Sequence, residues 1–207
     1  RELPDKEALV APNQRMTFRE LDSRVQALSN GLGALGVRHG DTVALWMTNT
    51  PDWVVVWFAC ARLGAVLVPI NTRYKLEETR YILQQSGARV LIAMDRYWGI
   101  DYLGMIQTMV PELEAMNPEH IVAAGLPALR SVVLWNGALA PGTLSLDGLI
   151  ERGTTSPAPH SEVTAGDPAI IVYTSGTTGW PKGAVHGHVA IRNSANIARA
   201  LHVETDD

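Results

Sequence analysis

Apolar residues recur every three or four positions between residues 21 and 35, which predicts an amphipathic helix. Thr17 and Glu20 stand before them with the spacing of a capping box, in which each side chain accepts a hydrogen bond from the other residue's backbone amide. Gly36 follows as a C-terminal stop signal. We therefore expect a helix that begins after Thr17 and ends at Gly36. Its apolar positions are Leu21, Val25, Leu28, Leu32 and Leu35.

Short apolar runs then alternate with further helical patterns over residues 43–93. Gly64 and Gly87 each follow a helical pattern at the position of a C-terminal cap. Because the runs are apolar throughout, the strands that they predict belong to a sheet covered on both faces. The expected fold class is α/β, with a doubly wound, mostly parallel sheet and flanking helices. The predicted strands are 43–47, 66–70 and 89–93, and the predicted helices are 53–63 and 76–85.

The periodic signal weakens in the second half of the chain. Residues 151–168 are rich in Gly, Ser, Thr and Pro and predict an exposed connection. The sequence thus predicts an N-terminal α/β subdomain (1–150), this connecting segment, and the truncated start of a second, phosphate-loop subdomain (169–207). Within the first subdomain, the weaker signals predict a helix at 102–109, a strand at 131–135 and a short helix at 146–150.

The amino-acid composition limits the kinds of partner and the cellular location that we expect. Of 207 residues, 46% are apolar and 18% are charged, which allows a buried core. The net charge is −4 and the basic residues are dispersed, so we expect no nucleic-acid partner. The longest apolar stretch, 53–61, is too short for a transmembrane helix. The single cysteine, Cys60, cannot form an internal disulfide and no apolar leader is visible, so we expect a reducing, cytoplasmic location.

The strongest chemical signal is the loop at residues 174–183, directly after a strand predicted at 169–173. The loop reads Thr-Ser-Gly-Thr-Thr-Gly-Trp-Pro-Lys-Gly. Its glycines free the backbone to turn several amides toward one point, its hydroxyl groups add donors, and Lys182 adds a positive charge. Amides, hydroxyls and an ammonium group together suit a polyphosphate. The candidate ligands are Thr174, Ser175, Gly176, Thr177, Thr178, Gly179, Lys182 and Gly183.

Two other interpretations of this loop have to be weighed. A Walker A loop places Ser or Thr after its lysine, whereas Gly183 follows Lys182 here and Pro181 precedes it, which disfavours a P-loop NTPase. A run of Gly, Ser and Thr is also typical of a plain surface turn. The strand before the loop and the lysine at its end favour anion binding over that turn.

The ten residues of the loop resemble the signature loop of the adenylate-forming (AMP-binding) superfamily, which holds acyl-CoA synthetases, peptide-synthetase adenylation domains and firefly-type luciferases. Residues 71–75, Asn-Thr-Arg-Tyr-Lys, are more similar to the carboxylate–CoA ligase branch than to the adenylation domains. Other segments resemble the superfamily in the same order, so that the resemblance covers most of the chain. These segments are 17–21, 40–45, 62–71 and 81–90.

The resemblance implies a ligase that forms acyl-CoA bonds in fatty acid metabolism. In such enzymes a carboxylate attacks the α-phosphate of ATP, pyrophosphate leaves, and CoA captures the acyl-adenylate. The resemblance implies that the loop holds the β- and γ-phosphates, that Thr174 also approaches Mg²⁺, and that Lys182 is catalytic because it offsets charge on the departing pyrophosphate. ATP, Mg²⁺, CoA and a small carboxylic acid are the expected cofactor and substrates.

Two alternatives stay open, namely an amino-acid adenylation domain of a peptide synthetase and a noncatalytic nucleotide- or phosphate-binding module. The family's adenine-binding, ribose-binding and C-terminal catalytic segments have no counterpart in residues 1–207. We therefore expect an N-terminal fragment that is inactive by itself. An exposed edge of its incomplete sheet would favour self-association into a homo-oligomer.

Several other conspicuous residues are assigned structural roles. Trp180 occupies a position that the family leaves variable, and we expect it to pack against the loop or the surface. If His186 and His188 lay on one strand they would share a face, but two ligands do not make a metal site, and His188 is expected to cap a helix over 190–201. The residues assigned to the core are Trp46, Trp53, Trp57 and Cys60.

Overall fold

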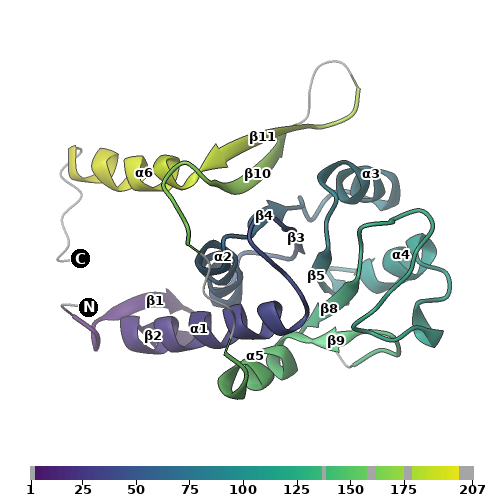
Figure 1. The fold of residues 1–207 in the computed structure, drawn as a ribbon, viewed down its shortest axis with the longest axis horizontal. Coiled ribbons are helices and arrows are strands. Elements are labelled where there is room, and N and C mark those ends of the chain that lie inside the picture. Colours follow the sequence, from purple (N-terminus) through teal and green to yellow (C-terminus); the bar gives the residue numbers. More distant parts are fainter. Residues whose placement is uncertain (1–2, 137–138, 158–161, 175–178, 201–207) are drawn as a thin grey trace.

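The centre of the molecule is a seven-stranded sheet flanked by helices, seen in a computed structural model that describes residues 3–136, 139–157, 162–174 and 179–200 (Figure 1). This architecture confirms the predicted α/β class. The helices are α1 (Phe18–Ala34), α2 (Pro51–Leu63), α3 (Leu76–Ser86), α4 (Tyr102–Met109), the 3-10 helix η1 (Leu113–Ala115), α5 (Leu146–Thr155) and α6 (His188–Ala200). The strands of the large sheet are β3 (Thr42–Trp46), β4 (Val66–Pro69), β5 (Val90–Met94), β8 (Ser131–Trp135), β9 (Leu144–Ser145), β10 (Pro168–Thr174) and β11 (Lys182–Gly187).

The strand order of this sheet is β11-β10-β4-β3-β5-β8-β9. All neighbouring strands are parallel except β11, which runs antiparallel to β10. From β3 the chain passes to β4 on one side and then crosses to β5 on the other, so the direction of winding reverses at β3. The carboxyl ends of β3, β4 and β10 lie along one edge of the sheet, where doubly wound proteins bind their ligands.

Helix ends follow the signals predicted from the sequence. At the start of α1, the Thr17 backbone amide donates to Glu20 Oε2 at 2.7 Å, and the Glu20 amide donates to Thr17 Oγ1 at 3.2 Å. This confirms the capping box, and the hydrogen bonds from the Thr17 amide and hydroxyl lower the pKa of Glu20. Gly64 and Gly87 end α2 and α3 in the left-handed conformation, as expected.

Helices cover both faces of the sheet. α1 packs against α2 and α5, and α3 packs against α4 (Figure 1). Trp46 and Cys60 are fully buried, whereas Trp53 and Trp57 are partly buried and pack against the core, so all four belong to it as predicted. Among the described helices, none combines the length and the apolar character needed to cross a membrane.

The predicted connection over 151–168 begins too early, because α5 continues to Thr155. Gly153 lies against α1, where Asn30 Nδ2 donates a hydrogen bond to the Gly153 carbonyl at 2.9 Å. The Gly and Thr content of this segment indicated a loop, but packing against α1 extends the helix. β10 joins the same sheet as the N-terminal strands, and the division into two subdomains stays a prediction.

Several short strands lie outside the elements predicted from the sequence. β1 (Glu7–Ala11) and β2 (Gln14–Thr17) form an antiparallel hairpin before α1, and β6 (Arg96–Tyr97) and β7 (Ile100–Asp101) form another after β5. β6, β7 and β9 are two residues long, too short for a hydrophobic pattern, and β1 and β2 lack the uninterrupted buried run that marks β3 and β5.

Candidate functional site

The loop predicted to bind phosphate joins the last two strands of the sheet. β10 ends at Thr174, and β11 begins at Lys182. The two residues are register partners in the antiparallel pair, so their side chains leave the hairpin on the same face. Both are exposed at the mouth of the loop. The structure thus brings together the hydroxyl and the ammonium group at the two ends of the predicted site.

The structure describes only some of the other predicted phosphate ligands. Ser175, Gly176, Thr177 and Thr178 lie outside the described residues. Gly179 has a φ of 119°, which a residue with a side chain adopts only with strain. The roles of all five in binding phosphate stay predictions.

Gly183 has a packing reason to be glycine. It pairs with Tyr173 across the hairpin, and a Cβ atom at Gly183 would lie 2.9 Å from Ile171 Cγ2 and 3.2 Å from Tyr173 Cζ. A larger residue would therefore clash with the side chains of Ile171 and Tyr173. A contact between the Gly183 amide and phosphate stays a prediction.

A hollow of about 630 Å³ opens at the carboxyl ends of β3, β4 and β10. It adjoins the loop, because Val172 and Tyr173 line it and Thr174 follows them directly. Its position matches the edge at which the winding of the sheet reverses. The lining residues are Met47, Thr48, Asn49, Trp53, Pro69, Ile70, Asn71, Thr72, Tyr97, Val172 and Tyr173.

Buried side chains hold one rim of this hollow in place. Trp46 Nε1 donates to the Asn71 carbonyl at 3.2 Å, and the Tyr102 hydroxyl donates to the Thr72 carbonyl at 2.9 Å. The two rings meet edge to face, with centroids 4.8 Å apart. Because both rings are fully buried, they fix the backbone that follows β4.

Sequence reasoning missed the polar residues of this hollow. Asn49, Asn71 and Tyr97 each come shortly after a predicted strand, and that position is the signal that could have found them. Tyr173 adds a phenol whose pKa is raised, mainly by burial and secondarily by nearby Tyr81. At neutral pH it is an uncharged hydrogen-bonding group beside the loop.

Asp167 anchors the other end of β10. Its carboxylate accepts hydrogen bonds from the Thr164 amide at 2.7 Å and from His39 Nε2 at 3.1 Å, and these two contacts lower its pKa. The Asp167 carbonyl accepts from the His188 amide, the first residue of α6, at 3.1 Å. The start of β10 is therefore tied both to α6 and to the turn before β3.

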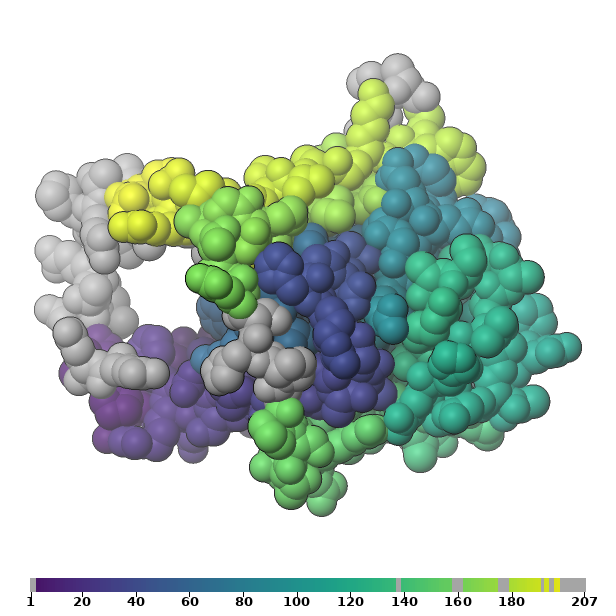
Figure 2. All heavy atoms as spheres, viewed as in Figure 1, coloured from purple at the N-terminus to yellow at the C-terminus, as the bar shows by residue number. Residues whose placement is uncertain are grey.

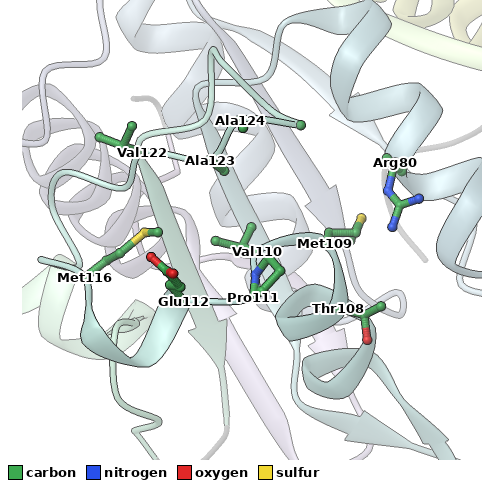
Figure 3. Close-up of a pocket in the computed structure, with 11 residues that line it drawn as sticks. Arg80, Thr108, Met109, Val110, Pro111, Glu112, Met116, Val122, Ala123 and Ala124 are labelled. Carbon is green, nitrogen blue, oxygen red and sulfur yellow. The ribbon is translucent and has the colours of Figure 1, made fainter.

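A second hollow, of about 610 Å³, lies between α3, the end of α4 and residues 116–125 (Figure 3). Its walls are mostly apolar, and it shares no lining residue with the hollow beside the loop. The guanidinium of Arg80 at its rim is paired with Glu77 at 2.9 Å. This hollow has the size of a ligand site, but its walls are mostly apolar and the arginine at its rim is already paired, which disfavours a polyphosphate.

Comparison with known proteins places the chain in a family. A family model described as AMP-binding enzyme matches residues 1–207. The chain belongs to this family. The mitochondrial medium-chain acyl-CoA ligase ACSF2 of Bos taurus is 34% identical over 203 residues, which are 94% of this chain and 33% of that protein.

Solved structures give the same assignment to the AMP-binding enzymes. The anthranilate CoA ligase AuaEII, crystallised with anthranoyl-AMP, has a TM-score of 0.80 and 31% identity, covering 94% of this chain and 34% of its own. A fatty acyl CoA synthetase of Mycobacterium tuberculosis has a TM-score of 0.72 and 28% identity, covering 96% and 35%. The chain thus spans about a third of the length of these relatives, and its predicted resemblance to the superfamily is confirmed.

The structure also bears on the residues considered as metal ligands. Within the described ranges, no cluster of three or more His, Cys, Asp or Glu residues could hold a metal ion. His186 lies in β11 and His188 begins α6, so the two do not lie on one strand. Thr174 offers one exposed hydroxyl, which fits Mg²⁺ because this ion takes most of its ligands from phosphate and water.

Proposed function

We propose that this protein is an AMP-forming carboxylate–CoA ligase whose residues 174–183 hold the triphosphate of ATP. The observation that carries the proposal is the pairing of Thr174 with Lys182 at the mouth of a hairpin loop, beside a hollow at the carboxyl ends of three strands. Family membership supports the reaction class. The similar proteins named above are ligases for medium-chain, fatty and aromatic acids, which supports a small carboxylic acid as substrate.

The proposed reaction joins two anions in its first step. A carboxylate oxygen bonds to the α-phosphorus of ATP while the bond to the bridging oxygen breaks, and pyrophosphate carries that electron pair away. The CoA sulfur then bonds to the acyl carbon, and AMP leaves. Repulsion between the anions and charge on the leaving group are the main obstacles, so fixed donors and cations around the β- and γ-phosphates lower the barrier.

The residues of the hairpin suit this task. Lys182 presents an ammonium group on the face shared with Thr174, close to where pyrophosphate would leave. Mg²⁺, when bound, would neutralise phosphate charge, with Thr174 as its protein ligand in this proposal. The buried pair Trp46 and Tyr102 keeps the rim of the hollow at Asn71 and Thr72 fixed, so that the substrates meet a preformed site.

Compartment, pathway class and assembly are parts of the same proposal. The lone thiol of Cys60 is buried, which supports a reducing compartment, the cytoplasm. Similarity to acyl-CoA ligases supports a role in fatty acid metabolism. β11 is an edge strand of the sheet, which supports self-association of the protein.

The test is ATP–pyrophosphate exchange by the full-length protein with a panel of carboxylic acids. Lys182→Ala should lower kcat/KM for exchange about 100-fold, the loss typical of removing one charge-stabilising donor. Lys75→Ala, which removes an exposed lysine outside the loop, should leave it within about twofold. Unchanged exchange in Lys182→Ala, or ATP binding without exchange for every acid, would contradict the proposal.

A further inference from the structure

The arm of the loop that leads into β11 consists of residues 179–181. Aromatic rings from two other elements lie close to it. The indole of Trp180 stacks on Tyr81 of α3, with ring centroids 5.0 Å apart and planes 25° from parallel. Tyr81 is also near enough to Tyr173, at the end of β10, to contribute to the raised pKa of that phenol. One helix residue therefore neighbours both sides of the hairpin, and this confirms the loop-packing role expected of Trp180.

α3 is a firm support for such a stack. Tyr81 is half-buried, and the next two residues, Ile82 and Leu83, are buried in the core. Trp180 is 54% exposed, whereas Pro181 after it is buried. Figures 1 and 2 show the hairpin lying next to α3 along one side of the molecule. The indole thus connects a surface loop to an element whose position the core sets.

The strand pairing of the sheet does not extend to the arm of the loop. The ladder between β10 and β11 ends at Thr174 and Lys182, so residues 179–181 lie beyond it. Among the described strands, β11 pairs with β10 alone. The stack on α3 is therefore a contact between this arm and an element outside the β10–β11 pair.

We infer that Trp180 is a positioning residue, which by stacking on Tyr81 holds the arm of the loop where Lys182 can meet the triphosphate of ATP. This inference rests on the proposed function. Fixing the arm before ATP arrives reduces the conformational entropy lost on binding, so the stack contributes to ATP affinity without touching the nucleotide. Because the inference ties the arm to the triphosphate alone, we expect the KM for the carboxylic acid to be unaffected.

The test measures ATP–pyrophosphate exchange by the full-length protein while ATP and acid are varied separately. Trp180→Ala and Tyr81→Leu should each raise KM for ATP about three- to tenfold, the range that an aromatic pair is worth, and leave KM for the acid within about twofold. Trp180→Phe and Tyr81→Phe keep a ring and should keep KM for ATP within about twofold. In the double variant Trp180→Ala/Tyr81→Leu, KM for ATP should be no higher than in the single variant with the higher KM, because both changes remove the same contact.

Phe18→Ala is the matched control. Phe18 is an aromatic residue of similar exposure, 50%, and lies on α1 away from the loop. The Phe18→Ala variant should leave KM for ATP and KM for the acid unchanged. A Trp180→Ala variant with a normal KM for ATP, or with equal increases in KM for ATP and acid, would overturn the positioning role while Lys182→Ala still supported the proposed function. Absence of exchange in the unmodified protein would overturn both.

Discussion

Cys60 is a thiol whose surroundings decide its chemistry. It lies on α2 and is fully buried in the core. Burial in an apolar environment disfavours the thiolate and raises the pKa of Cys60 from an ordinary value of 9.0 to about 12. Near neutral pH, this shift lowers the thiolate fraction about a thousandfold. Because the thiolate is the nucleophile, Cys60 is a small core residue and not a reactive group.

We expect Cys60 to resist alkylation in the native protein. With iodoacetamide at pH 8, the peptide that contains Cys60 should be labelled at least about 100-fold more slowly in the folded protein than in urea, since both the raised pKa and the burial of sulfur slow the reaction. Mass spectrometry of digested samples over time gives both rates. Labelling at equal rates would show that the α2 face carrying Cys60 is open to solvent.

The contact between α1 and α5 depends on two glycines that let the backbones touch. A Cβ atom at Gly153 would lie 1.7 Å from the carbonyl oxygen of Ala27, and one at Gly31 would lie 2.2 Å from that of Leu149. Backbone atoms cannot move aside as the end of a long side chain can. A methyl group at either position therefore forces the two helices apart.

Gly153→Ala should lower the free energy of unfolding by about 2 kcal/mol, although alanine favours a helix by about 1 kcal/mol over glycine. Gly125→Ala is the control, because a Cβ atom there would meet nothing within 4 Å. It should change stability by no more than about 0.5 kcal/mol. Urea denaturation followed by circular dichroism measures both. Equal losses in the two variants would contradict the close packing of α1 on α5.

Elements with local signals could be predicted from the sequence, and elements that depend on packing could not. The capping box at Thr17 and the glycine caps at Gly64 and Gly87 act within one turn of a helix, so their ends follow from the residues alone. The end of α5 is different. Only contact with α1 shows that Gly153 belongs to a helix, because glycine and threonine otherwise indicate a loop.

The candidate site divides in the same way. Thr174 and Lys182 belong to a contiguous motif and could be predicted from it, and the structure shows why they meet, since they face each other across the hairpin. Asn49, Asn71 and Tyr97 come from three separate segments. Their common position becomes visible only when the order of the strands is known. The sequence reveals the loop, and the topology reveals the hollow beside it.

At the scale of the whole molecule, the described residues form two hollows of similar volume that are candidate ligand sites. One lies beside the loop at the carboxyl ends of β3, β4 and β10, and the other lies between α3 and α4. Volume does not separate them. The first adjoins the loop whose two ends carry an exposed hydroxyl and an exposed lysine, whereas the arginine of the second is already paired with an acidic residue. Charge and sheet topology therefore both favour the first hollow for the ATP site that we propose.

The most direct measurement is a crystal structure of the full-length protein with Mg²⁺ and an ATP analogue whose α,β-bridge is a methylene group. The account predicts that the triphosphate lies at the mouth of the β10–β11 hairpin, with phosphate oxygens within hydrogen-bond distance of the Thr174 hydroxyl and the Lys182 ammonium group. A nucleotide bound in the hollow beside Arg80, or phosphates that touch neither Thr174 nor Lys182, would contradict it.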